Sequence, residues 1–118
     1  MRSPTAGSDD CPFCDIVWRG APANVVERWP DAWAIVPLNP VVPGHVLVIP
    51  LEHVEDALER PSVTGLTFAR AAELADRPCN LITSAGAAAT QTVLHLHVHV
   101  VPRRFGDGLR LPWSSHRS

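Results

Sequence analysis

Three histidines near the C-terminal end of the chain alternate with aliphatic residues: His95, His97 and His99 are separated by Leu96 and Val98. Strict alternation is typical of an extended strand, so all three imidazoles are predicted to lie on one face of that strand. A single histidine on a half-buried strand is usually a core or surface residue with one satisfied hydrogen bond. Three at period two instead indicate a face that serves chemistry or a metal.

A second group that could do chemistry lies near the start, where Cys11 and Cys14 have Cys-x-x-Cys spacing. In a reducing compartment such a pair is more plausibly half of a metal site, or a redox pair, than a structural disulfide. Tetrahedral zinc would need two further nitrogen or sulfur ligands from elsewhere. A thioredoxin-like redox site lacks its expected βαβ context here. The third cysteine, Cys79, is interpreted as a small core residue.

Length and composition bound the class of protein. With 118 residues, 46% of them hydrophobic, the chain can form one domain with a single core. The net charge is −2 and the sequence has no lysine, which argues against a nucleic-acid groove. No apolar run approaches the ~20 residues of a membrane span, and the polar residues 1–10 lack a signal-peptide core, so we expect a flexible N-terminal tail and a cytoplasmic protein without membrane or nucleic-acid partners.

The elements that must position these residues follow from patterning. A hairpin is predicted from Asn24–Arg28 and Ala32–Val36, which are separated by turn-forming residues. The three prolines of Pro37–Gly44 exclude a helix and predict a rigid loop that delivers His45 to a strand over Val46–Ile49. Between Cys14 and this hairpin we expect only a short mixed segment.

Two helices are predicted in the middle of the chain. Leu51–Arg60 has acidic residues in its first turns and stops at Pro61, and a second helix capped by Ser62 or Thr64 runs to about Arg77. Asn80–Ser84 is strand-like, and the tiny residues of 85–90 are predicted to form a loop. The fold class is therefore α+β: an antiparallel sheet of about five strands, with two helices packed on one side.

The histidine segment also resembles a known motif. The run from His95 to Val101 is similar to the His-φ-His-φ-His-φ-φ signature of the histidine triad (HIT) superfamily of nucleotide hydrolases and transferases, where φ is hydrophobic. The preceding Gln91-Thr92-Val93 and the segment Pro40–Pro50 resemble the other signature stretches of that superfamily. The resemblance extends from Cys11 to Trp113, so residues 11–113 are expected to form the HIT domain and 114–118 a C-terminal tail.

The resemblance implies roles for particular residues. His97 would be the nucleophile, attacking the α-phosphorus of a nucleotide to give a nucleotidyl-histidine intermediate that water then resolves. The remaining nucleotide- and phosphate-binding positions would be His45, Asn39, Ser84, Gln91, Thr92 and His99.

The resemblance also completes the metal site and suggests an assembly. In zinc-bearing members of the superfamily the two missing ligands correspond to His53 and His95, which implies a structural zinc held by Cys11, Cys14, His53 and His95. The competing interpretation is an exposed thiol pair with His53 at a helix start. Members usually pair their sheets in a homodimer, and Trp113 is a residue that could reach a partner subunit or simply lie on the surface.

Three substrate classes remain open: nucleoside phosphoramidates, acyl or aminoacyl adenylates, and dinucleoside polyphosphates. The sequence departs from the superfamily at Pro37, where many members have an aspartate that binds ribose hydroxyls, and at Ser84-Ala85, where asparagine is common. A catalytically idle nucleotide-binding module with a structural zinc site is the alternative function if these departures spoil the pocket.

Overall fold

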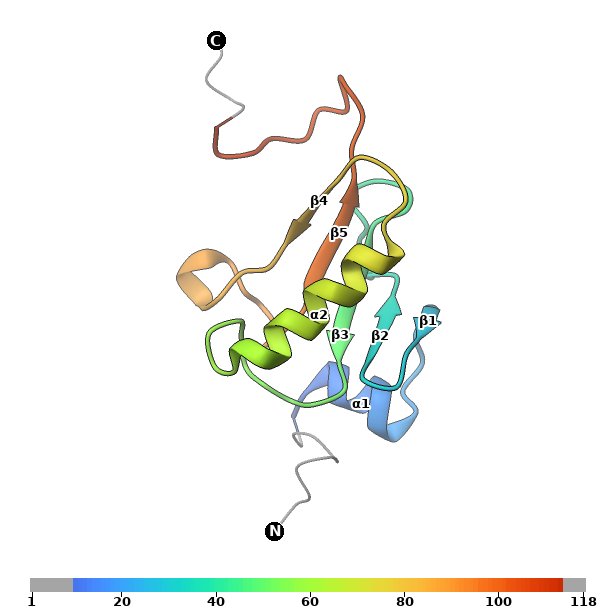
Figure 1. The fold of residues 1–118 in the computed structure, drawn as a ribbon, viewed down its shortest axis with the longest axis vertical. Coiled ribbons are helices and arrows are strands. Elements are labelled where there is room, and N and C mark those ends of the chain that lie inside the picture. Colours follow the sequence, from blue (N-terminus) through green and yellow to red (C-terminus); the bar gives the residue numbers. More distant parts are fainter. Residues whose placement is uncertain (1–9, 114–118) are drawn as a thin grey trace.

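The structure is a computed structural model that describes residues 10–113, and the predicted tail residues 1–9 and 114–118 lie outside the described part. Within these described residues, five antiparallel strands form one sheet in the order β1-β2-β3-β5-β4, accompanied by two α-helices and one short 3₁₀ helix (Figure 1). The predicted α+β class is thus confirmed. The elements are α1 (Pro12–Arg19), β1 (Val25–Arg28), β2 (Ala32–Ile35), β3 (Val46–Pro50), α2 (Pro61–Leu74), β4 (Cys79–Ile82), η2 (Ala87–Ala89) and β5 (Val98–Pro102).

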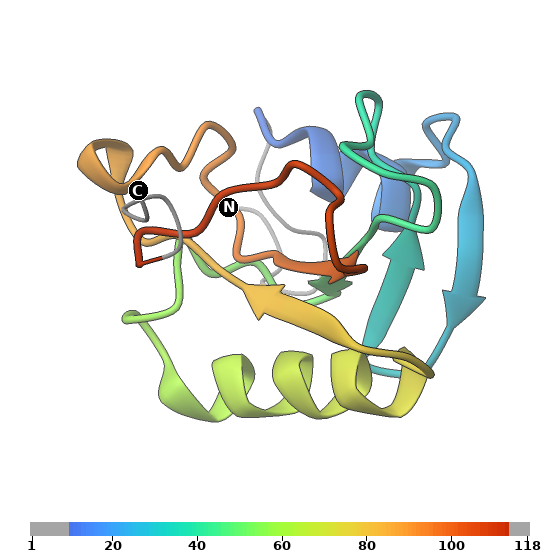
Figure 2. The same ribbon diagram turned by 90° about the horizontal axis from the view of Figure 1, so that it is seen from above.

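The two helices lie on opposite faces of the sheet, as the second view shows (Figure 2). Ala71 of α2 packs on one face against Val48 and Val98, whereas Phe13 of α1 packs on the other against Leu47. The expectation that both helices share one side was wrong. Every residue of β3 is buried. Because neighbouring strand residues point to opposite faces of the sheet, this burial requires packing on both faces.

Helix α1 replaces the mixed segment predicted after Cys14. Cys11 is its N-cap, with the Sγ atom accepting a hydrogen bond from the Cys14 backbone N–H at 3.3 Å. Pro12 occupies the first turn, and Gly20 closes the helix in the left-handed conformation at φ 75°. Proline at the start and glycine just past the end are standard helix boundaries. The cysteine pair therefore lies on the first turn of a short helix.

The helix predicted over Leu51–Arg60 is absent, and the segment is a loop of turns and bends. Its backbone groups are used for contacts with other segments: the Val54 carbonyl accepts from the Leu96 N–H at 2.8 Å, and the Glu55 carbonyl accepts from the Gln91 side chain at 2.6 Å. The Glu55 N–H is bonded to a glutamate side chain, which removes another helical donor. Tertiary hydrogen bonds have outweighed local helix propensity here.

Helix α2 begins at Pro61, with Arg60 as the N-cap, so the predicted Ser62 or Thr64 cap was wrong. Proline is well suited to the first helical position, because its missing N–H has no partner there anyway. The Thr64 hydroxyl donates instead to the Ala57 carbonyl at 2.7 Å, which holds the preceding loop against the helix. The helix ends at Leu74, three residues before the predicted end.

Strand β5 begins only at Val98, so the strand predicted through all three histidines is shorter than expected. His99 pairs with Leu47 of β3 and with Ile82 of β4. His95 and His97 precede the strand, in a segment that is bonded to the loop after β3. The predicted hairpin β1–β2 and the strands β3 and β4 are present near their expected positions.

Within the described residues, no helix is long and apolar enough to span a bilayer.

Candidate functional site

Two cysteines and two histidines from three separate segments converge at one point. Their ligand atoms all lie within 4.8 Å of one another, with Cys11 and Cys14 on α1, His53 in the loop after β3 and His95 in the segment before β5. The Nδ1 atom of His95 lies 3.2 Å from the Sγ of Cys11, 3.5 Å from that of Cys14 and 3.1 Å from the Nδ1 of His53. The structure has brought together all four residues predicted as metal ligands.

These distances fit a tetrahedral zinc ion. With zinc bonds of about 2.05 Å to nitrogen and 2.3 Å to sulfur, the N···N edge of a tetrahedron is roughly 3.3 Å and the S···N edges roughly 3.5 Å. The measured N···N separation is 3.1 Å, and the S···N separations are 3.2, 3.3 and 3.5 Å. Two thiolates and two imidazoles form a closed donor set that suits a structural ion.

The surroundings of the cluster determine the protonation of its ligand atoms. The Nε2 of His95 lies 2.9 Å from the Pro50 carbonyl, which can only accept, so Nε2 carries the proton and Nδ1 presents its lone pair to the cluster. Burial lowers the pKa of His95 to about 4, which keeps the ring neutral. Burial raises the pKa of the Cys11 thiol to about 11, so a metal ion must displace the thiol proton on binding.

His97 is held by a hydrogen bond of the same kind through its other nitrogen. Its Nδ1 lies 2.8 Å from the His95 carbonyl, so Nδ1 donates and Nε2 keeps a free lone pair. The ring of Phe13 stands edge-on to both His95 and His97, at centroid distances of 5.7 and 5.2 Å. Burial lowers the pKa of His97, against the opposing effect of the hydrogen bond to His95, so the ring is neutral at pH 7. A neutral ring with a bare Nε2 is the nucleophilic form of histidine.

His99 and His45 form a pair beside His97. The His97 and His99 rings are 5.2 Å apart between centroids, and the His45 and His99 rings are also 5.2 Å apart. The Nε2 of His45 lies 2.9 Å from the Nδ1 of His99, and the Val41 N–H donates to the Nδ1 of His45 at 3.1 Å. The triad histidines and His45 therefore make one continuous row, although they come from β5, from the segment before it and from the loop before β3.

The side chain of Gln91 is buried and fully occupied by backbone contacts. Its Oε1 accepts from the Gly86 N–H at 2.7 Å, and its Nε2 donates to the carbonyls of Glu55 and Val93 at 2.6 and 2.9 Å. These bonds fasten the loop that carries η2 to the segment before His95. Gln91 thereby determines where the backbone of that segment lies.

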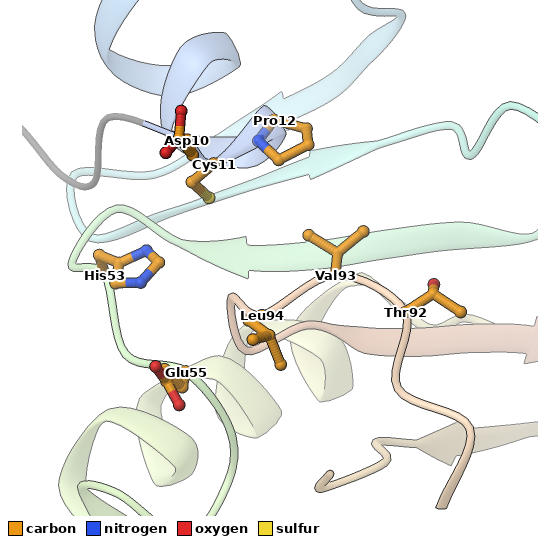
Figure 3. Close-up of a pocket in the computed structure, with 8 residues that line it drawn as sticks. All are labelled: Asp10, Cys11, Pro12, His53, Glu55, Thr92, Val93 and Leu94. Atoms are coloured by element: carbon orange, nitrogen blue, oxygen red, sulfur yellow. The ribbon is translucent and has the colours of Figure 1, made fainter. Parts of the chain in front are cut away.

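The other predicted phosphate-binding residues lie in loops. Asn39 is exposed between β2 and β3, and Ser84 is half-buried between β4 and η2. Thr92 is exposed and lines a cavity of about 380 Å³ that includes Cys11 and His53 (Figure 3). Thr92 therefore lines the same cavity as two of the four clustered residues, and that cavity does not include His97.

Several contributors to the site had no role in the sequence interpretation. Phe13 is one of the two residues between the cysteines of the Cys-x-x-Cys pair and was assigned no role of its own. The backbone groups of Pro50 and Val41 carry no sequence signal at all. The helical signals around Cys11 were readable: proline at the first helical position and glycine past the end mark α1.

The chain is similar to known proteins in both sequence and structure. A family model described as HIT domain matches residues 19–106. An uncharacterized HIT-like protein of Mycobacterium tuberculosis is 38% identical over 109 residues, covering 84% of this chain and 75% of that protein. Adenylylsulfatase HINT3 of Arabidopsis thaliana is 30% identical over 116 residues, covering 91% of this chain and 57% of that protein.

Among solved structures, a zinc-bound histidine triad family protein from Mycobacterium smegmatis superposes with a TM-score of 0.77 at 36% identity, covering 86% of this chain and 80% of that one. With the family model spanning most of the sequence and the row of histidines in place on the fold, the chain belongs to the HIT domain family.

Proposed function

We propose that this protein is a nucleotide hydrolase or transferase that acts at the α-phosphorus through a nucleotidyl-histidine intermediate. The observation that carries the proposal is the state of His97, whose Nδ1 is committed to the His95 carbonyl at 2.8 Å. The Nε2 lone pair is therefore the reactive atom of a neutral ring that is held in a single orientation. His99, next to His97, can supply a hydrogen bond to a phosphoryl oxygen.

The reaction proceeds in two displacements. In the first, Nε2 of His97 forms a bond to the α-phosphorus, and the bond from phosphorus to the leaving group breaks with its electron pair going to the leaving group. In the second, a water oxygen bonds to phosphorus, the P–N bond breaks and its electron pair returns to Nε2. The water proton is released with the nucleoside monophosphate, and His97 is regenerated.

The substrate classes under this proposal are nucleoside phosphoramidates, acyl or aminoacyl adenylates and dinucleoside polyphosphates. All three carry a leaving group on the α-phosphorus of a nucleotide. A relative named an adenylylsulfatase, 30% identical to this chain, supports a substrate with an adenylyl group.

The test compares wild type with His97→Ala on one adenosine substrate of each class, with AMP release as the readout. His97→Ala should retain under a few per cent of the wild-type rate, a barrier increase of more than ~2 kcal/mol, while it still folds and binds AMP. Cys79→Ala is the matched control, since Cys79 is a half-buried residue of β4 outside the row of histidines. A mutant with substantial turnover would exclude a covalent His97 mechanism, and mass spectrometry of a quenched wild-type reaction should detect the adduct.

We also propose that Cys11, Cys14, His53 and His95 hold one structural zinc ion. The ion would cross-link α1, the loop after β3 and the segment before β5. Support comes from the separations of their ligand atoms and from the zinc-bound relative from M. smegmatis. Protein prepared without chelator should contain about one zinc per chain. A Cys14→Ser protein that binds zinc as tightly as wild type would contradict this assignment.

A catalytically idle nucleotide-binding module with the same zinc site remains the second candidate function. One observation favours it: three cavities of about 380 to 390 Å³ open on the described residues, and His97 lines none of these three. This candidate predicts AMP binding without turnover of any of the three substrates. The same assay therefore separates the two functions.

We further propose a homodimer in the cytoplasm. Among residues 10–113 no further strand pairs with the outer edge of β4, and Trp113 is 71% exposed, so both are available to a second copy. The thiols of Cys11 and Cys14, which are not joined in a disulfide, need a reducing compartment. Light scattering at several protein concentrations tests the dimer, and Trp113→Ala should weaken it if the residue lies in the interface.

A further inference from the structure

The four residues proposed to hold zinc differ in how accessible they are. Cys14 and His95 are completely buried. Cys11 is 3% exposed, and His53 is half-buried. Cys11 and His53 also line the cavity of about 380 Å³ in Figure 3, and the two completely buried ligands do not. An ion that reaches the cluster from this cavity therefore meets Cys11 and His53 first.

Two carboxylates share this cavity with the two accessible ligands. Asp10 directly precedes Cys11 in the chain, and Glu55 follows His53 by two residues, so each acid accompanies one ligand. In Figure 3 the Asp10 and Glu55 side chains lie at opposite ends of the group, with Cys11 and His53 between them. Carboxylate oxygens bind zinc and other divalent cations. The cavity therefore offers a cation its first protein contacts outside the cluster itself.

The loop that carries His53 is strongly acidic. Residues 52–60 contain four carboxylates and one arginine, a net charge of −3, whereas the whole chain has a net charge of −2. Glu52 pairs with that arginine, Arg60. The other three carboxylates take part in none of the ion pairs formed within residues 10–113. With His53 they line a second cavity of about 390 Å³: Glu55, Asp56 and Glu59. A concave site lined by one sign of charge raises the local concentration of counter-ions, here cations.

We propose that the cavity of Figure 3 is the route by which zinc enters and leaves the cluster, and that Asp10 and Glu55 form a transient cation-binding site on this route. The inference rests on the proposed zinc site, which the route serves. The first cavity is the route because two of the four ligands line it, whereas only His53 lines the second. The carboxylates of the second cavity attract cations to the region without holding them at the cluster.

Charge distinguishes the transient site from the final one. Two thiolates and two neutral imidazoles neutralise a divalent ion completely, because each thiol loses its proton to water when it binds the metal. A nearby carboxylate therefore interacts little with the completed cluster. On the route the cation is not yet neutralised, and a carboxylate attracts it strongly. Loss of the charge of Asp10 or Glu55 should thus raise the barrier for entry and for exit alike, and leave the affinity nearly unchanged.

Isotope exchange measures these barriers on the full-length, zinc-loaded protein. Protein loaded with an enriched zinc isotope is mixed with an excess of natural-abundance zinc ion, and mass spectrometry follows the isotope that stays bound after rapid desalting. The decay gives the dissociation rate constant, and competition with a chelator of known affinity gives Kd. Glu55→Gln should slow the exchange by about fivefold or more and change Kd by less than about twofold, so the association rate constant falls by a similar factor.

The sign of the effect separates this role from a structural one. Glu55→Gln keeps the side-chain length and both backbone hydrogen bonds of the residue. A variant that merely loosened the loop would release zinc faster, whereas loss of the transient site slows release. Glu55→Asp retains the charge and should restore most of the wild-type rate. Glu27→Gln is the matched control, because it removes the same charge from β1, lines neither cavity and should exchange at the wild-type rate.

Asp10→Asn tests the choice of cavity, because Asp10 lines only the first. It should slow exchange by about threefold or more, and Glu59→Gln, which affects only the second cavity, should have a smaller effect. Exchange at or above the wild-type rate in Glu55→Gln or in Asp10→Asn overturns the proposal, as does a larger effect of Glu59→Gln than of Asp10→Asn. Protein that contains no zinc contradicts the zinc site itself and the route with it, so metal analysis before the exchange distinguishes the two failures.

Discussion

Replacement of Leu96 by alanine should loosen the segment that positions the reactive histidines. Leu96 lies between His95 and His97, is 1% exposed, and packs against Val54 and Val63. Its N–H also donates to the Val54 carbonyl at 2.8 Å. This small cluster joins the histidine segment to the loop after β3 and to α2.

The magnitude follows from burial. Leu96→Ala removes three buried carbon atoms, worth about 0.8 kcal/mol each, and leaves part of their volume as a cavity. We therefore expect the free energy of unfolding to fall by about 3 kcal/mol. Leu96→Met conserves most of the volume and should cost less than about 1.5 kcal/mol. Leu58→Ala is the surface control, because Leu58 is 76% exposed, and should change stability by no more than about 0.5 kcal/mol.

Urea unfolding of the zinc-loaded protein, followed by circular dichroism, measures the loss. Because the His95 carbonyl orients the His97 ring, turnover of an adenylyl substrate by the folded Leu96→Ala protein should also fall, mainly through kcat. A destabilisation below ~1 kcal/mol would mean that Leu96 does not anchor the segment. Full activity in a clearly destabilised mutant would mean that the anchor does not position His97.

Four further outcomes are expected. Chelation of zinc should lower the melting temperature before it lowers the intrinsic rate, and equal melting curves with and without chelator would contradict a structural ion. Thr90 has a left-handed backbone at φ 72°, so Thr90→Gly should stabilise by about 1 kcal/mol in urea unfolding, whereas Thr90→Ala should not. Burial, with the neighbouring His97 and His45, lowers the pKa of His99 from 6.5 to about 4. As the pH drops, the unfolded chain therefore binds a proton at His99 before the folded protein does, and the free energy of unfolding should fall between pH 6.5 and 4. His99→Gln should reduce the slope of this fall by up to about 1.4 kcal/mol per pH unit. Wild type should discriminate weakly between ribose and deoxyribose substrates. Pro37→Asp should raise the ratio of their kcat/KM values by roughly tenfold or more, because it adds one charge-assisted hydrogen bond. A strong ribose preference in wild type would show that another residue makes the contact.

Local sequence patterns predicted much of the sheet and the residues of the site. The hairpin of β1 and β2 and the strand β3 follow from short β-rich runs bounded by turn residues and prolines. The four metal-ligand candidates came partly from spacing and partly from the family resemblance, and all four converge. These features are carried by side-chain type and spacing, which a sequence displays directly.

The failures occurred where tertiary contacts compete with local preference. Residues 51–60 have helical composition, yet their backbone groups bond to Leu96 and Gln91, and the segment stays in a loop that presents His53. The histidine strand starts late for the same reason, because the segment before Val98 bonds to that loop before it reaches β3. Propensity is worth only tenths of a kcal/mol per residue, so a few long-range hydrogen bonds reverse it.

The sequence by itself determined which residues are available for chemistry: the row of histidines, the thiol pair and the proline-rich loop before His45. Only the tertiary structure decided which ring nitrogen of His45, His95 and His97 carries the proton. That choice is made by three backbone groups, the carbonyls of Pro50 and His95 and the N–H of Val41. Every residue carries nearly the same backbone groups, so no sequence pattern marks these three, and their effect arises only when the fold places them within hydrogen-bond distance of a ring.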